Sequence, residues 1–222
     1  MFKQIFELFK SDSLYEQAHD ECHEMLEIVR EMFNESTNTL RKTDTADISI
    51  DIYATDKKIN EFERDVRRKI MTHLVVGGQE DIGAGLILVS VVVDIERMGD
   101  YTKNIYDLAV QHPKKLSAGV YEKDLSNIEA STKSFLNESI DAFKNQDIDK
   151  ARELMQNYKT DISSLSAEIV KGIVSNKNNE FSPDVSGALC LYARYLKRIA
   201  AHSRNLISSI VNPFERIGYP EK

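Results

Sequence analysis

The sequence predicts an all-α fold of six long helices, arranged as two pseudo-symmetric antiparallel three-helix bundles in one compact chain. Three observations support this prediction. The 222 residues include only nine Gly and four Pro, two residue types that long helices avoid. Apolar residues recur at helical spacing in six long segments. The second half of the chain repeats the apolar pattern of the first half.

The first unit is expected to contain three helices, at about residues 14–42, 46–77 and 80–111. Ser13 suits the N-cap of the first helix, because its hydroxyl can accept a hydrogen bond from the first turn. Gly77 and Gly78 end the second helix. Pro113 ends the third, since proline cannot continue a helix. The first repeat is therefore placed at 1–113.

The second unit, placed at 114–222, is expected to repeat the plan with helices at about residues 120–144, 148–175 and 183–211. Ser182 and Pro183 match an N-cap followed by proline in the first helical position. Asn212 and Pro213 end the last helix.

The most informative feature of the chain is an internal repeat whose second copy has lost its acidic residues. Residues 94–105 align without a gap with residues 195–206, and the Arg, the Asn and the apolar positions are kept. The acids are lost: Asp94 becomes Tyr195, Glu96 becomes Lys197 and Asp100 becomes Ala201. The second copy has thus kept what helix packing needs and lost what could hold a cation.

The lost acids suggest a metal site in the first repeat. Glu96 and Asp100 lie at i and i+4, which places their Cβ atoms about 5–6 Å apart on one helix face. Asp56 and Asn60 have the same spacing on the preceding helix. Oxygen ligands of this kind suit Mg, Mn, Fe or Zn. The four residues predict a two-helix oxygen cage, and the alternative is an ordinary solvated acidic face.

The equivalent positions of the second repeat are Lys159, Ser163, Lys197 and Ala201. None of them is acidic, and a lysine repels a cation. Any metal is therefore expected in the first repeat alone, and an empty site is the alternative.

Helical spacing predicts one main apolar stripe on the third helix: Ile87, Val91, Ile95, Met98, Ile105 and Ala109. Three valines lie just before the acids, on the face away from this stripe: Val89, Val92 and Val93. An exposed apolar strip often marks an interface, so a homodimer is predicted. The strip could equally dock another partner or be covered by the neighbouring bundle.

Composition excludes several classes of function. The net charge is −7 and no dense basic tract occurs, so nucleic-acid binding is not expected. The longest apolar run, residues 86–93, is far short of the about 20 residues of a membrane span. The N-terminus carries charges inside its apolar part and lacks a secretory signal. A cytoplasmic protein is expected, with Cys22 and Cys190 as free thiols.

One further pair could bind a metal. His19 and His23 lie one helical turn apart, as in zinc-binding His-x-x-x-His pairs, although a polar face of the first helix explains them equally well. The spacing is not that of a zinc protease, because Glu21 occupies the wrong position between them.

Residues 56–68 and 94–105 together resemble the paired helices of the PhoU family of phosphate-uptake regulators. The resemblance covers nearly the whole chain, including the duplication. It implies a non-enzymatic regulator that connects a phosphate transporter to a sensor histidine kinase.

The resemblance also implies a multinuclear iron or zinc cluster held by E(D)xxxD motifs. Glu96 and Asp100 match this motif fully; Asp56 matches, but Asn60 stands in place of an acid. The alternative function is a metal-carboxylate helical bundle with redox or hydrolytic activity. That class needs Glu-x-x-His motifs, and neither Glu96 nor Asp100 is followed by His three residues later.

Overall fold

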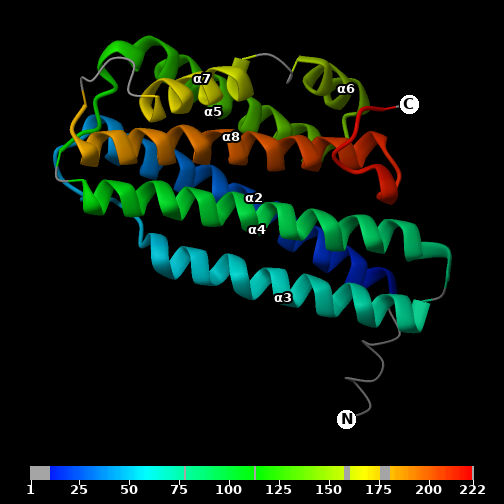
Figure 1. Ribbon diagram of the computed structural model, residues 1–222. Helices are drawn as coiled ribbons and strands as arrows, with labels where there is room; N and C mark the ends of the chain where they lie inside the picture. The colour runs from blue at the N-terminus through cyan, green and yellow to red at the C-terminus, as the bar shows by residue number, and fades with distance from the viewer. Residues whose placement is uncertain (1–10, 78, 113, 158–160, 176–180, 222) are drawn as a thin grey trace.

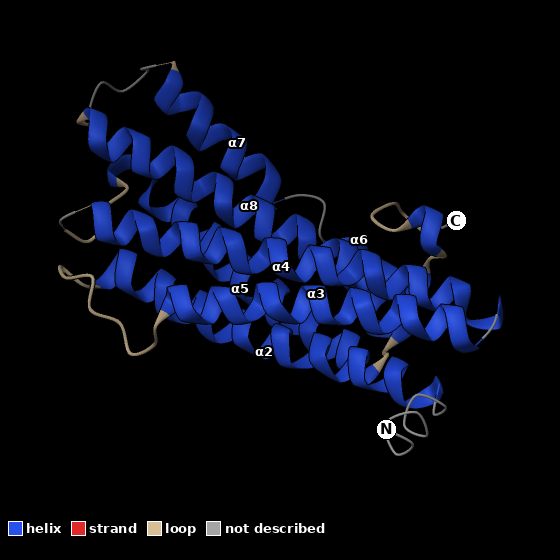
Figure 2. Cartoon of the chain, turned by 90° about the horizontal axis from the view of Figure 1, so that it is seen from below, coloured by secondary structure: helices blue, strands red, loops and turns tan. Residues whose placement is uncertain are grey.

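The computed structural model describes residues 11–77, 79–112, 114–157, 161–175 and 181–221. Over these residues the chain forms seven α-helices and three short 3-10 helices, with no strand (Figures 1 and 2). The predicted all-α fold is confirmed. No helix in this part of the chain is both long enough and apolar enough to cross a membrane.

The first unit consists of α2 (Ser11–Lys42), α3 (Ile52–Gly77) and α4 (Ile82–Gln111), each of which packs against the other two. The apolar stripe predicted on α4 is buried: it includes Val91, Ile95, Met98, Ile105 and Ala109. Its partners on α2 and α3 are also fully buried: Met25, Val29, Ile59 and Val66. Helical spacing of apolar residues therefore identified the core faces.

The start of the second helix was predicted wrongly. It begins at Ile52, not near Ala46, because the Oδ1 atom of Asp51 accepts a hydrogen bond from the Ala54 N–H at 3.0 Å and caps the first turn. Residues 44–51 form a connecting loop, from which Ile48 and Ile50 pack against the core. An apolar contact from a loop is indistinguishable in sequence from one more turn of helix.

The second unit contains α5 (Glu122–Asn145), α6 (Ile148–Asn157), α7 (Asp161–Val174) and α8 (Pro183–Val211). The single helix expected over 148–175 is instead two helices. α6 and α7 each pack against both α5 and α8. Asp161, the first residue of α7, is a residue type that favours the start of a helix over its interior, so the sequence allows a second helix to begin there.

The ends of α8 agree with the prediction. Pro183 occupies the first helical position, and Ser182 is the extended N-cap residue. Asn212 closes the C-terminal end, where its N–H donates to the carbonyl of Ser208. The boundary predicted between the two repeats, near residue 113, stays a prediction.

α4 and α8 join the two units along their lengths, as Figure 1 shows. The valine strip on α4 is covered: Val92 is fully buried, and Val89 and Val93 are partly buried against the core. The strip is therefore not the exposed surface on which the homodimer prediction was based.

Candidate functional site

The packing of α3 against α4 brings the four predicted site residues together. Asp56 and Asn60 face α4 from the first turns of α3, and Glu96 and Asp100 lie on α4. The Glu96 and Asp56 side chains retain 12% and 14% of their exposure, against 29% for Asp100. These side chains form a partly buried acidic cluster between α3 and α4, named the acidic groove below, so a fully solvated face does not describe them.

The Lys103 side chain lies between two carboxylates of this groove. Its ammonium Nζ lies 2.8 Å from Oδ2 of Asp56 on α3 and 3.1 Å from Oδ1 of Asp100 on α4. Burial alone would lower the pKa of Lys103, but hydrogen bonds to both carboxylates raise it overall. The lysine thus bridges the two helices as a cation would.

The other groups of the groove are also engaged. The side-chain amide of Asn60 donates to the Asp56 carbonyl at 3.0 Å and, more weakly, to Asp56 Oδ2 at 3.3 Å. Arg97 lies 3.2 Å from Asp100 and 3.5 Å from Glu96. Asn60 therefore acts as a donor that orients Asp56.

The surroundings of Glu96 disfavour the charged form of its carboxylate. Burial raises its pKa, and the nearby charges of Asp100, Glu63 and Asp56 raise it further, while Arg97 opposes them. Removing a carboxylate from water while other carboxylates surround it disfavours its charged form. A cation placed here would relieve that cost.

The donors do not fit the multinuclear iron or zinc cluster that the family resemblance implies. Lys103 already supplies positive charge between Asp56 and Asp100, and the amide of Asn60 adds no negative charge. A single divalent ion bound through Asp56, Glu96 and Asp100 stays a prediction. Such an ion must first displace Lys103.

The second repeat offers no acidic counterpart at the equivalent positions. Lys197 and Ala201 lie partly buried on α8, and Ser163 lies on α7. Lys159 lies outside the described residues. The positions on α7 and α8 that correspond to the acids of the first repeat therefore carry Lys, Ala and Ser.

His202 follows this degenerate motif, and it contacts the first repeat instead. Its Nδ1 lies 2.6 Å from Oδ1 of Asp94 on α4, and the same oxygen accepts a hydrogen bond from Asn205 at 2.9 Å. Tyr101 stacks on the imidazole, with ring centroids 5.7 Å apart. This polar cluster belongs to the interface between α4 and α8.

A second polar cluster was not anticipated from the sequence. The Arg41 guanidinium on α2 donates to Glu129 on α5 at 2.6 Å, and the buried Tyr192 hydroxyl of α8 donates to the same oxygen at 2.8 Å. The charge of Glu129 and hydrogen bonds to Glu122 and Glu129 raise the pKa of Arg41, although burial opposes them. Nothing in the spacing of these residues indicates that they meet, because they come from three distant helices.

A family model for the PhoU domain matches the chain twice, at residues 22–109 and 125–210. The chain belongs to the PhoU family. Each match spans most of one helical unit, which agrees with the duplication seen in the sequence.

Curated PhoU relatives resemble the chain over nearly its full length. A Clostridium acetobutylicum protein described as a phosphate-specific transport system accessory protein, PhoU homolog, is 23% identical over 211 residues, which is 92% of this chain and 93% of the relative. A second such homolog, from Thermotoga maritima, is 22% identical and covers 95% of this chain and 87% of its own length.

Two solved PhoU structures share the fold. PhoU from Pseudomonas aeruginosa superposes with a TM-score of 0.78 at 19% identity, over 90% of this chain and 96% of that one. The phosphate transport system regulatory protein PhoU from Streptococcus pneumoniae gives 0.66 at 18% identity, over 93% and 94% of the two chains. The PhoU arrangement of helices thus persists at low identity.

Proposed function

We propose that this protein is a non-enzymatic regulator of phosphate uptake and phosphate signalling. The observation that carries the proposal is the double match to the PhoU domain, together with relatives named as accessory proteins of a phosphate-specific transport system. The alignments cover 93% and 87% of the two relatives, so the proposal draws on nearly their whole length.

The chemistry of the acidic groove supports a regulatory role over a catalytic one. Asp56 and Asp100 are both paired with Lys103, and Arg97 pairs with Asp100. Carboxylates held in this way stabilise the packing of α3 on α4. They are already paired with cations, whereas a general acid or base needs a carboxyl group within hydrogen-bond reach of a substrate proton.

The proposed regulator works in the cytoplasm by docking a phosphate transporter and a sensor histidine kinase. A candidate surface for the transporter is the end of the α3–α4 hairpin, where apolar side chains are unusually exposed: Met71, Val75, Val76, Ile82 and Leu86. Contiguous exposed apolar side chains commonly mark interaction sites. Val75 is the most exposed of them, at 82%.

The regulatory role is tested by deleting the gene in its own host and measuring uptake of radiolabelled phosphate in phosphate-rich medium. Loss of a restraining regulator should raise uptake and phosphate-starvation gene expression, and re-expression of the wild-type chain should restore both. Unchanged uptake and expression would overturn the proposal.

The docking surface is tested with the purified transporter in detergent. Val75→Asp should weaken co-elution with the transporter, because it places a charge in the apolar surface. Val174→Asp is the matched control, since Val174 is 75% exposed on the distant α7. Equal loss in both variants, or none in either, would exclude this surface. Separate co-elution with the sensor kinase tests the second partner.

A further inference from the structure

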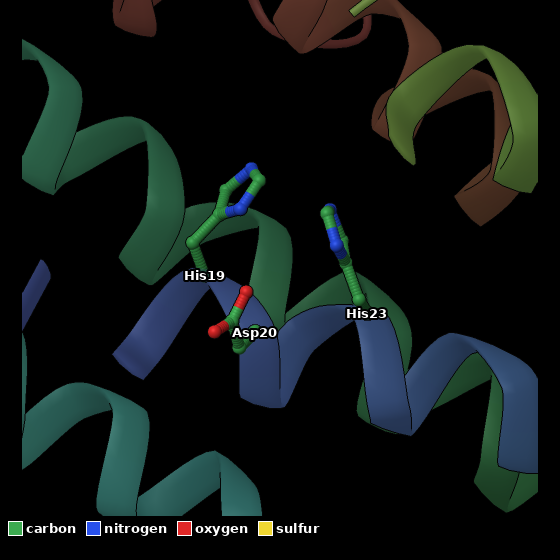
Figure 3. Close-up of side chains that lie close together, drawn as sticks. All are labelled: His19, Asp20 and His23. Atoms are coloured by element: carbon green, nitrogen blue, oxygen red, sulfur yellow. The ribbon is translucent and has the colours of Figure 1, made fainter. Parts of the chain in front are cut away.

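A compact group of metal-ligating side chains lies on α2, away from the acidic groove. His19, Asp20 and His23 each present one ligand atom, and these atoms all lie within 4.8 Å of one another. Figure 3 shows both imidazoles rising from the same side of the helix, with the Asp20 carboxylate beside them. Among the described residues, no other group of three His, Cys, Asp or Glu side chains converges this closely.

The helix itself produces this convergence. Residues at i and i+4 lie one above the other, so His19 and His23 meet on one face, with ring centroids 4.2 Å apart. Asp20 follows His19 directly and precedes His23 by three residues, which places it at the edge of the same face. Ligands on one tetrahedral zinc ion lie about 3.3 Å apart, so small side-chain rotations close the site.

Both imidazoles pack against the same aromatic side chain. Phe143 of α5 contacts both rings, with centroid distances of 5.9 Å to His19 and 5.8 Å to His23. Within the described ranges of the chain, the Nε2 atom of His23 is buried and has no hydrogen-bond partner. A buried polar atom without a partner carries a free-energy cost, which a bound metal ion would remove.

This group differs from the acidic groove in the ion pairing of its carboxylate. In the described part of the chain Asp20 forms no ion pair, whereas Asp56 and Asp100 are bridged by Lys103. The positive charge of Lys144 also acts on His23, and the Lys144 ammonium pairs with Glu27 at 2.7 Å. An incoming cation therefore displaces no ion pair at Asp20.

A cavity of about 320 Å³ opens beside the group. His19 and Asp20 line it together with Tyr15, Glu16 and Gln146. Glu16 precedes His19 by three residues, so one Glu-x-x-His spacing occurs in this chain. The cavity leaves room for water or an exogenous ligand at a metal ion held by the three side chains.

We propose that His19, Asp20 and His23 bind one divalent transition-metal ion, with Zn²⁺ the best match to the ligand set. Two imidazoles and one carboxylate are typical zinc ligands, and imidazole discriminates against Mg²⁺, which prefers oxygen. Three protein ligands leave a fourth position open toward the cavity. The proposal does not depend on the regulatory function, and it concerns a site separate from the E(D)xxxD motif.

The test is calorimetric titration of the full-length, chelator-treated protein with zinc chloride. Wild type should bind one equivalent, and His19→Gln and His23→Gln should each lower the affinity at least about tenfold, since even indirect ligand partners contribute that much. The same titration with magnesium chloride should show no binding at this site. Circular dichroism checks that each variant retains its helices.

Two controls separate this site from the others. His112→Gln removes a histidine at the end of α4, outside the group, and should leave zinc affinity unchanged. Glu96→Gln with Asp100→Asn removes the acidic groove and should also leave it unchanged. Absence of zinc binding in wild type would overturn the proposal. Zinc binding that survives both histidine substitutions, or that disappears in the groove variant, would overturn it as well.

Discussion

The imidazole of His202 on α8 lies 2.6 Å from the carboxylate of Asp94 on α4 and connects the two repeats. Asp94 is nearly buried, at 8% exposure, and also accepts a hydrogen bond from Asn205. In the second repeat the position of Asp94 is occupied by Tyr195. The interaction is therefore asymmetric: Asp94 of the first repeat pairs with His202 of the second, and the second repeat has no acid at the position equivalent to Asp94.

Asp94→Asn should lower the free energy of unfolding by about 1–3 kcal/mol, because the buried hydrogen bonds to His202 and Asn205 lose their charged acceptor. Urea denaturation followed by circular dichroism measures this change. Asp149→Asn is the matched control, since the Asp149 side chain is 99% exposed. Equal stability of the two variants would show that the Asp94 cluster contributes little.

Glu96→Gln should stabilise the protein near neutral pH. Burial raises the pKa of Glu96 in the folded state, so the folded protein binds more protons than the unfolded chain. Stability therefore falls as pH rises from the unfolded pKa through the folded pKa. Gln has no such ionisation, so its advantage should be present above the folded pKa and vanish in acid. Urea titrations from pH 4 to pH 7.5 test this, and a less stable variant at neutral pH would contradict it.

Lys103→Met should convert the acidic groove into a better cation site. Without the ammonium, Asp56 and Asp100 repel each other and the free energy of unfolding should drop by about 1–3 kcal/mol. Added Mn²⁺ should then raise the melting temperature of the variant more than that of wild type, because binding to the folded state stabilises it.

The first-repeat site predicts two further outcomes for metal content. Glu96→Ala with Asp100→Ala should abolish any Mn²⁺ response of the Lys103→Met variant. Lys197→Met, the equivalent change on the second repeat's motif, should produce no response. A response from Lys197→Met would show that the sequence comparison selected the wrong half of the chain.

Gly99→Ala should destabilise the junction of α3 and α4. A Cβ atom at Gly99 would lie 2.8 Å from Cδ1 of Ile59 and would force that buried side chain to move, at a cost of about 1–3 kcal/mol against the about 1 kcal/mol that Ala gains in helix propensity. Gly187→Ala is the matched control on α8, where an added Cβ meets nothing within 4 Å. It should stabilise by about 0.5–1 kcal/mol, because Ala favours helix over Gly. Urea denaturation of both variants measures these opposite effects, and two shifts of the same sign would contradict the packing.

Homodimerisation stays a prediction, although the valine strip that motivated it is covered. Light scattering at micromolar concentration should give twice the mass of the 25.3 kDa chain if the protein is a dimer. A monomer would exclude a stable dimer and leave the exposed end of the α3–α4 hairpin for other partners.

Local patterns in the sequence were enough to predict the helical class, most helix ends and the core face of α4. Ser182 with Pro183 and Asn212 with Pro213 act on the nearest turn of helix, so their effect can be read from neighbouring residues. The stripe through Val91, Ile95 and Met98 follows from helical periodicity alone. Asp56, Glu96 and Asp100 lie close together across α3 and α4, and their role as metal ligands stays a prediction.

Tertiary structure decided which charged groups meet. Lys103 lies one turn from Asp100, but its second partner, Asp56, is 47 residues away on α3. Asp94 and His202 are separated by 108 residues and pair only because α4 packs on α8. The valine strip appeared exposed from sequence, and its burial depends on the packing of α4 within the bundle. Periodicity and capping depend on residues a few positions apart, whereas ion pairing and burial depend on how distant helices pack, and nothing local in the sequence encodes that contact.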